Sequence, residues 1–392
     1  MNPALLQMTP FLAMDIREDA GKLEREGVDI VHLDVGEPDF NVHPLVVAAL
    51  KDALDDNRTH YTDGFGDMEL REAVCRLYKT EHGVDIAPER VMVTGGSSPA
   101  LLLALLALCD NGDEILVPAP GYPCYRDFVL ACRGRPVDLP VSSSQGFQPD
   151  PSDVAKAITQ RTRGIFVNSP SNPAGTVAEP ERLRELARIC PGDADDAPVI
   201  LSDEIYDGLV YGGCRSHSIL EYTDNAFVFN GFSKRFAMTG LRLGYAIVPE
   251  RFLSAMRILQ QNLFICAGAA VQRAGLAALQ LLLGEHRRSA EFRTAQAKML
   301  AEYDARRKFM LDRIRDIGMT VAAEPCGAFY VFADARRYTN DSLKFTQDVL
   351  ARAHVGITPG TDFGVSGQGF LRFSYANSIP RIREAFNRMA EF

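Results

Sequence analysis

Residues 90–109 read RVMVTGGSSPALLLALLALC and combine three patterns that decide the fold. Arg90–Thr94 is a short, largely apolar run, which predicts a buried strand. Gly95 and Gly96 predict a turn, and the apolar segment Pro99–Cys109 is long enough for a helix. A strand, a glycine turn and a helix in this order form the unit from which parallel sheets with helical connections are built.

The same alternation of strands and helices continues after this segment. Further short apolar strands are predicted at Glu114–Val117, Pro136–Leu139, Gly164–Val167, Val199–Ser202, Ala226–Phe229 and Tyr245–Val248. A helix is predicted between two of them, at Glu179–Ile189. Continuous runs of Val, Ile and Leu indicate strands that are covered on both faces. We therefore expect an α/β protein whose large domain has three layers, α/β/α, around a mainly parallel sheet.

The two ends of the chain have a different pattern. Residues 11–27 show helical periodicity, and a long helical stretch at about 270–317 has a break near Gly284. The remaining predicted elements are strands at Val31–Val35, Met319–Ala323, Ala328–Phe332 and Phe370–Ser374, and helices at Asp341–Ala353 and Arg381–Phe392. This mixture predicts a smaller α+β domain built from both chain ends, residues 1–45 and 285–392, beside a large cofactor-binding domain at 46–284.

Composition argues against several classes of protein. The net charge is −9 without a basic cluster, so nucleic acid is not an expected partner. The longest apolar run, near Ala100–Cys109, is too short to span a bilayer, and we expect no membrane segment. The eight cysteines contain no CxxC pair and the chain starts without a signal-peptide pattern, which favours reduced thiols and a cytoplasmic location. The seven histidines lack metal-ligand spacing, so no metal is expected.

Polar, glycine-rich segments follow several of the predicted strands. Ligands bind beyond the carboxyl ends of the strands in open parallel sheets, so these segments are candidates for a site. They are Gly95–Ser98, Asn168–Gly175, Asp203–Tyr206 and Gly231–Arg242. The first lies between a strand and a helix, where free N–H groups and the helix dipole favour an anion.

Lys234 stands out among these segments because apolar residues follow it. Apolar surroundings depress the pKa of a lysine and make its amine nucleophilic. Arg242, eight residues further on, is suited to gripping a phosphate. Asp203 ends an apolar strand, and a buried carboxylate there requires a cation such as a protonated pyridine nitrogen. Taken alone, each residue has an ordinary interpretation. Lys234 could be a surface lysine, Arg242 an ion-paired arginine and Asp203 a helix N-cap.

Taken together, these segments resemble the fold-type-I pyridoxal-phosphate enzymes, and most closely the class I/II aminotransferases of the aspartate aminotransferase superfamily. The resemblance runs in order along nearly the whole chain. The matching segments are Gly36–Phe40, Tyr61–Gly64, Gly95–Gly96, Asn168–Gly175, Ser202–Tyr206, Ser233–Gly244 and Arg372–Asn377. It implies the PLP-dependent transferase fold, pyridoxal 5'-phosphate (PLP) as cofactor, and transfer of an amino group between an L-amino acid and a 2-oxo acid.

The resemblance also implies roles around the cofactor. Lys234 would carry it as a Schiff base and then move the substrate's α-proton. Asp203 would pair with the ring nitrogen, Tyr206 and Asn172 would bind the phenolic oxygen, and Tyr122 would stack on the ring. The phosphate would be held by Arg242 together with Gly96, Ser97, Ser98 and Ser233. Many relatives have a phosphate-binding serine three residues before the lysine, where this chain has Gly231, so the hydroxyl that binds the phosphate stays open.

For the substrate, the resemblance implies that Arg372 clamps the α-carboxylate, with help from Asn172 and the backbone of Gly36. Tyr61 would reach the phosphate of the neighbouring subunit, which implies a homodimer with shared active sites. The substrate side chain cannot be read from the sequence. Candidate determinants are the N-terminal segment and the region 260–270, with Gln260, Asn262 and Phe264.

Three other functions are alternatives to transamination. A C–S or β-eliminating lyase uses the same fold and the same lysine, and these motifs do not separate it from an aminotransferase. A nicotinamide oxidoreductase would need GxGxxG after its first strand, which Gly95–Ser98 does not supply. A non-catalytic protein on this fold would be expected to have lost Lys234, Asp203 or Arg372, and all three are present.

Overall fold

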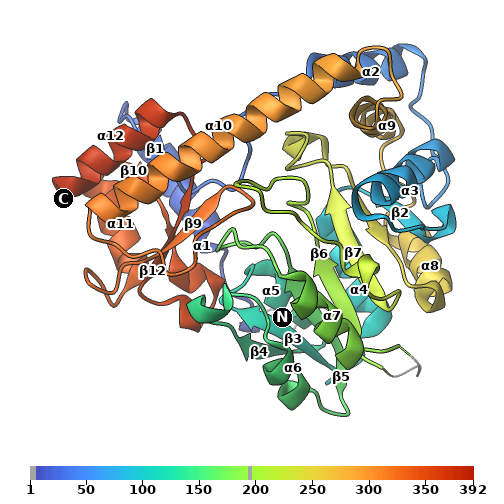
Figure 1. Cartoon of the computed structure of the whole chain (residues 1–392), viewed down its shortest axis with the longest axis horizontal. Helices are drawn as coiled ribbons and strands as arrows, with labels where there is room; N and C mark the ends of the chain where they lie inside the picture. Colours follow the sequence, from blue (N-terminus) through green and yellow to red (C-terminus); the bar gives the residue numbers. More distant parts are fainter. Residues whose placement is uncertain (1–5, 193–196) are drawn as a thin grey trace.

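A seven-stranded sheet forms the centre of the molecule in the computed structural model, which describes residues 6–192 and 197–392 (Figure 1). The strands, in spatial order, are β2 (Val91–Thr94), β8 (Gly244–Ile247), β7 (Ala226–Gly231), β6 (Val199–Asp203), β5 (Thr162–Asn168), β3 (Glu114–Ala119) and β4 (Arg135–Pro140). Strand β8 runs antiparallel to both of its neighbours, and the remaining pairs are parallel. The predicted mainly parallel sheet is therefore confirmed.

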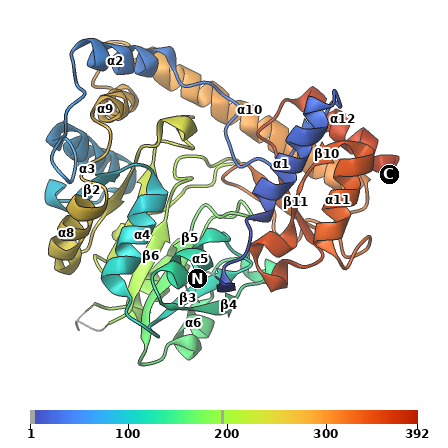
Figure 2. The same cartoon turned by 180° about the vertical axis from the view of Figure 1, so that it is seen from behind.

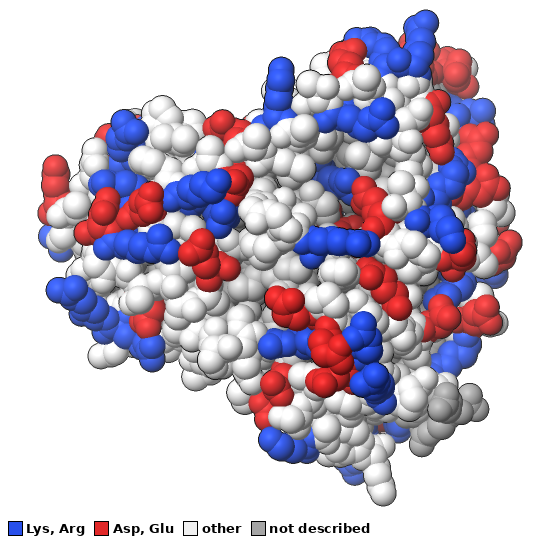
Figure 3. Space-filling view, in the orientation of Figure 1, with Lys and Arg blue, Asp and Glu red and all other residues white. Residues whose placement is uncertain are grey.

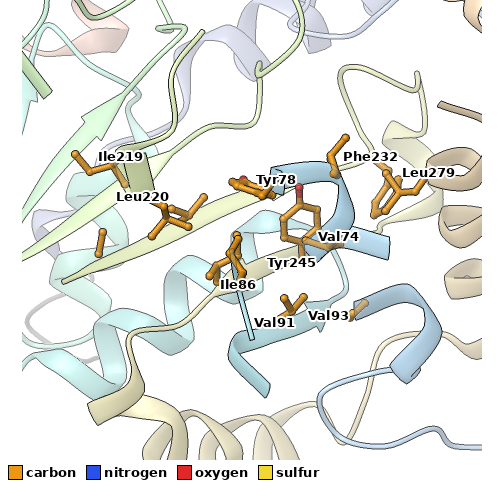
Figure 4. Close-up of a cluster of buried hydrophobic side chains, with 14 of the residues drawn as sticks. Val74, Tyr78, Ile86, Val91, Val93, Ile219, Leu220, Phe232, Tyr245 and Leu279 are labelled. Atoms are coloured by element: carbon orange, nitrogen blue, oxygen red, sulfur yellow. The ribbon is translucent and has the colours of Figure 1, made fainter. Parts of the chain in front are cut away.

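Successive side chains of the strands enter cores on opposite faces of this sheet. In β2, Val91 and Val93 pack with Tyr78 and Phe232 on one face (Figure 4), whereas Met92 belongs to the core on the other face. Burial on both faces explains why the strands have apolar runs instead of polar alternation. The helices that pack into the first core are α2 (Pro44–Asp55), α3 (Met68–His82), α6 (Pro151–Ala157), α7 (Pro180–Ile189), α9 (Ala269–Leu283) and the first turn of α10 (Ser289–Asp316). Those of the second core are α4 (Ser97–Leu108), α5 (Cys124–Ala131) and α8 (Leu253–Leu263).

Both chain ends build the smaller part of the molecule, as the sequence predicts. Its strands are β1 (Val31–His32), paired in parallel with β10 (Val355–Gly356), and an antiparallel group of β11 (Thr358–Pro359), β12 (Phe370–Ser374) and β9 (Tyr330–Asp334). Its helices are α1 (Leu12–Arg25), α11 (Ser342–Ala353) and α12 (Ile379–Ala390). The long helix α10 (Ser289–Asp316) runs from α2 and α9 to these elements (Figure 1). The boundaries at residues 45/46 and 284/285 remain a prediction.

One predicted strand, Met319–Ala323, is wrong. Only Thr320 pairs with a strand, through an isolated antiparallel bridge to Asp334. The chain then leaves the sheet, and the N–H groups of Cys326 and Gly327 donate to Gly175 O at 3.0 and 2.8 Å. The apolar residues of this segment therefore pack beside the sheet without extending its hydrogen-bonded ladder.

The surface mixes charges of both signs. On the face shown in Figure 3, Lys and Arg are interspersed with Asp and Glu. The eight cysteines are free thiols. Among the described residues, no helix combines the length and the apolar character that crossing a bilayer requires.

Candidate active site

A cavity of about 660 Å³ lies beyond the carboxyl ends of the central strands. Strands β5 and β6 are in register there, with Asn168 beside Asp203, and both residues line the cavity. Most of the predicted site residues join them. Those that line the cavity are Gly36, Ser97, Ser98, Tyr122, Asn172, Asp203, Tyr206, Ser233, Lys234, Arg242 and Arg372. The fold thus brings Gly36 and Arg372, which lie 336 residues apart in the sequence (372 − 36), into one cavity.

Lys234 lies in the turn after β7, with its amine in the cavity. Its Nζ donates to Gly36 O at 2.6 Å. Burial lowers the pKa of Lys234 to about 8; Glu37 opposes this decrease, and the positive charges of Arg372 and Arg242 add to it. A substantial fraction of the amine is therefore neutral, and nucleophilic, at mildly alkaline pH.

Asp203 is the last residue of β6 and is buried. Its Oδ2 accepts a hydrogen bond from Tyr125 Oη at 2.6 Å, and its Oδ1 accepts one from Ile205 N at 3.2 Å. Burial raises the pKa of Asp203 to about 6, while these two hydrogen bonds and the charge of Lys234 act in the opposite direction. A buried carboxylate that faces a cavity is the partner that a protonated ring nitrogen requires.

The N-terminus of α4 supplies an anion site at one end of the cavity. No side chain caps this helix at Gly96, so its first N–H groups are available to a ligand. Gly96 does not itself line the cavity. Its φ is +104°, and a Cβ there would lie 2.5 Å from Arg242 Nη2, so only glycine lets the arginine approach this turn.

Position 231, where the family resemblance predicts a phosphate-binding serine, has no room for one in this chain. A Cβ at Gly231 would lie 2.8 Å from Gly244 Cα, which leaves no room for a side chain at that position. Ser97, Ser98 and Ser233 all line the cavity, and which of these hydroxyl groups would bind the phosphate stays a prediction.

At the other end, Arg372 of β12 presents a fixed guanidinium. Its Nη2 donates to Asp34 O at 2.6 Å, and its Nη1 donates to Asn172 Oδ1 at 3.0 Å. The guanidinium carbon lies 4.4 Å from the centre of the Tyr330 ring. Within the described residues its buried Nε has no hydrogen-bond partner. A held arginine with an unused donor suits a carboxylate ligand.

Two tyrosines in the site were not predicted. Tyr125 holds Asp203, and Tyr330 Oη lies 2.8 Å from Tyr206 Oη. Tyr330 also restricts position 36 to glycine, because a Cβ on Gly36 would lie 2.6 Å from the Tyr330 hydroxyl. In the sequence each of these tyrosines has the pattern of a packed core residue, and only the fold shows what its hydroxyl group contacts.

The last turn of α3 anchors the segments that carry the site. Arg235, next to Lys234, forms two hydrogen bonds of 2.7 Å with Glu81. The ring nitrogens of the buried His82 lie 3.0 Å from Asp207 and 3.2 Å from Glu221. In the described part of the chain, Glu81, His82 and Asp207 are the one group whose ligand atoms are close enough together for a metal ion. Hydrogen bonds within the protein already engage these side chains.

The predicted determinants of the substrate side chain divide into two groups. Gln260, Asn262 and Phe264 do not line this cavity, and the Gln260 amide instead donates to Val93 O at 3.3 Å. The N-terminal segment does reach the cavity, through Phe11, Ala13, Met14 and Arg17. Tyr61 lies outside the cavity with 80% of its surface exposed.

Comparison with known proteins establishes the family. The profile of the family described as Aminotransferase class I and II matches residues 28–388. The chain belongs to this family. The enzyme is thus an aminotransferase, its cofactor is pyridoxal 5'-phosphate, and the lyase alternative is not supported.

Relatives and solved structures match the enzyme over its whole length. It is 39% identical to the (5-formylfuran-3-yl)methyl phosphate transaminase of Methanocaldococcus jannaschii, over 100% of this chain and 99% of the relative. It is also 39% identical to a valine–pyruvate aminotransferase of Mycobacterium tuberculosis, over 98% and 96% of the two chains. The structure of an aspartate aminotransferase from Thermus thermophilus with maleate superposes with a TM-score of 0.92, at 34% identity and 100% and 99% coverage.

Proposed function

We propose that Lys234 holds PLP covalently and moves the proton in transamination between an L-amino acid and a 2-oxo acid. The observation that carries this proposal is the convergence of Lys234, Asp203, Arg242 and Arg372 on one cavity. The residues fit the cofactor, since a buried carboxylate, an uncapped helix N-terminus and an amine of lowered pKa match its ring nitrogen, phosphate and aldehyde. When bound, PLP withdraws electrons from the substrate's Cα.

The chain's own residues then orient the substrate and move the proton. Arg372 binds the α-carboxylate and fixes which bond at Cα faces Lys234. Such orientation can supply several kcal/mol of the barrier reduction, about 7–11 kcal/mol at most. The neutral Nζ of Lys234 accepts the proton from the substrate's Cα and returns it to a different atom. Hydrolysis by water then releases the 2-oxo acid, and a second 2-oxo acid takes up the amino group by the reverse sequence. Tyr206 and Asn172 hold the ring oxygen, and Tyr122 covers the ring.

Replacing the lysine tests this assignment. Lys234→Ala should abolish turnover with every amino donor, because both the covalent attachment and the proton transfer need the amine. Lys344→Ala, at an exposed lysine paired with Asp348, is the matched control and should keep the wild-type rate. The measurement is 2-oxo acid formation in single- and multiple-turnover assays. Turnover by Lys234→Ala comparable to wild type would refute the proposal.

We also propose a homodimer in which Tyr61 completes the partner's site. The exposed apolar side chains around Tyr61 support this proposal. Gly64 packs against Gln261 and the backbone of Ile265, which places the Tyr61 segment beside the end of α8. Exposed there are Tyr61 (80%), Leu263 (52%), Phe264 (40%) and Ile265 (47%). Exposed apolar side chains in neighbouring segments, as here, are typical of a subunit interface.

Mixing Lys234→Ala and Tyr61→Ala subunits tests the shared site. If Tyr61 acts across the interface, a heterodimer of Lys234→Ala and Tyr61→Ala subunits contains one site with both residues intact. Unfolding and refolding the mixture should therefore recover activity, up to about one site in each heterodimer. If Tyr61 served its own subunit, every site in the mixture would lack one residue, and no activity would return. Each variant refolded alone is the control.

We further infer a cytoplasmic location, which the eight free thiols support. Recovery of the enzyme from an oxidising compartment would contradict it.

A further inference from the structure

Arg17 of α1 stands at the mouth of the active-site cavity. It lines the cavity together with Ala13 and Met14, which lie on the same side of the helix one turn earlier. Arg17 and Met14 are exposed, whereas Asp203 and Arg372 at the inner end of the cavity are buried. The guanidinium is therefore placed where a substrate side chain would leave the pocket.

Contacts at its N-terminus hold α1 over the cavity. Asp362 accepts hydrogen bonds from Leu12 N at 2.7 Å and Ala13 N at 3.3 Å. The ring of Phe11, just before the helix, packs edge-on against Tyr122 with ring centres 6.2 Å apart. The helix also contacts α11 and β11 and lies beside them in Figure 2. Arg17 is thus carried by a helix that, with the residue before it, contacts both parts of the molecule.

Arg17 differs from the other cations of the cavity because it has no partner among residues 6–192 and 197–392. Lys234 donates to Gly36 O, Arg242 to Thr239 O and Arg372 to Asp34 O. In the described residues Arg17 forms neither a hydrogen bond nor an ion pair. Glu37, the acidic group on the same rim, is already engaged by the hydroxyl of Thr239. A free guanidinium is a ready partner for a planar or tetrahedral anion.

We propose that Arg17 binds a second anionic group, a carboxylate or a phosphate, at the end of the substrate opposite its α-carboxylate. The proposal rests on the proposed function, in which Arg372 holds the α-carboxylate at the inner end. The substrate side chain then extends toward the mouth and meets Arg17. The enzyme accordingly prefers amino acids and 2-oxo acids whose side chains end in an anion.

Paired substrates and a matched variant test this. Arg17→Met keeps the length of the side chain and removes its charge, and Arg25→Met makes the same change at an exposed position of α1 that does not line the cavity. In Arg17→Met, the ratio of kcat/KM for glutamate to that for alanine should fall by about ten- to a hundredfold, the loss expected for one charge-assisted hydrogen bond. The loss should come from a higher KM for glutamate, and Arg17→Lys should restore part of the lost kcat/KM. Arg25→Met should leave the ratio unchanged.

The phosphate form of the ligand is tested with O-phosphoserine as the donor. If its kcat/KM falls with that of glutamate, Arg17 recognises either anion, and if only one of the two falls, that anion is the ligand. A binding readout is calorimetry of the PLP-loaded enzyme with glutarate and butyrate. Wild type should bind glutarate more tightly than butyrate, and Arg17→Met should bind both alike.

Two results would overturn the inference. One is an unchanged glutamate/alanine ratio of kcat/KM in Arg17→Met. The other is a wild-type preference for basic donors such as lysine, which would show that Glu37 and not Arg17 binds the substrate side chain. Failure of the proposed function would look different. Wild type would then transfer no amino group from any donor that depends on Lys234.

Discussion

At the scale of single residues, the acid–base properties of Asp203 depend on a hydroxyl group that the sequence does not single out. Tyr125 donates to its Oδ2 at 2.6 Å and lowers a pKa that burial otherwise raises. Tyr125→Phe should therefore raise the pKa of Asp203 and move the acid limb of the kcat/KM profile to higher pH by about 1–2 units. The control is Tyr303→Phe. It removes a buried hydroxyl that lies outside the cavity and has no side-chain hydrogen-bond partner in the described part of the chain. An acid limb that stays in place would contradict the role of Tyr125.

Lys234 gives a second prediction at this scale. Burial lowers its pKa to about 8, and only the neutral amine attacks an aldehyde. The rate at which the cofactor-free enzyme develops the absorbance of lysine-bound PLP should therefore rise with pH through about 8 and then level off. Stopped-flow absorbance across pH 6–10 measures it. A profile that rises only near 10.5 would show that the amine is not desolvated, and a flat profile would show that its protonation does not control the reaction.

The sequence singles out Lys234 and Asp203 because charged residues after apolar strands are costly unless they bind something, whereas Arg372 is predicted only from the family resemblance. Tyr125 and Tyr330 could not be found in this way. A tyrosine within an apolar helix or strand has the pattern of a core residue, and its hydroxyl partner depends on elements far away in the sequence. The sequence predicts only that the N-terminal segment contributes to substrate specificity, and it does not single out Arg17. One arginine on an amphipathic helix has the pattern of a solvent-exposed residue.

At the scale of elements, the last turn of α3 fixes the segments that follow β6 and β7. Burial alone would lower the pKa of His82, but hydrogen bonds to Asp207 and Glu221 raise it to about 10. A histidine whose pKa is raised on folding adds stability below its unfolded value of 6.5, and this contribution disappears as pH rises toward 10. His82→Gln should therefore lower the free energy of unfolding by about 3 kcal/mol or more at pH 6 and by less at pH 9.5.

Thermal or denaturant unfolding at both pH values measures this difference. His60→Gln, at an exposed position, is the control and should change stability little at either pH. A deficit in His82→Gln that is the same at pH 6 and pH 9.5 would show that the histidine acts through packing and not through its charge.

Element prediction from sequence worked best where both faces of a strand are buried. The long apolar runs at β5, β6 and β7 predict strands and, through them, the edge at which the site lies. It failed at Met319–Ala323, where an apolar segment packs beside a sheet and pairs at one position only. An apolar pattern indicates that a segment is buried. A strand also needs a neighbouring strand with free backbone N–H and C=O groups, which the pattern does not show.

At the scale of the whole molecule, the exposed apolar surface around Phe264 is the proposed subunit interface. A charge at the centre of an apolar interface is desolvated without a partner, so Phe264→Asp should weaken dimerisation by about a hundredfold or more. Sedimentation velocity over a concentration series measures this shift toward monomer. Val365→Asp, at another exposed apolar residue, is the control. Loss of dimers in both variants, or in neither, would contradict this placement of the interface.

The central claim is that Lys234 is the residue to which the cofactor is covalently attached, and borohydride reduction tests it most directly. Reduction of the PLP-loaded enzyme turns the Schiff base into a stable secondary amine, which can be located by peptide mass spectrometry after digestion. The structure predicts that the added mass of reduced PLP lies on the peptide that contains Lys234, and that none is found in Lys234→Ala. Reduced cofactor on a different lysine of the wild-type enzyme would contradict the account.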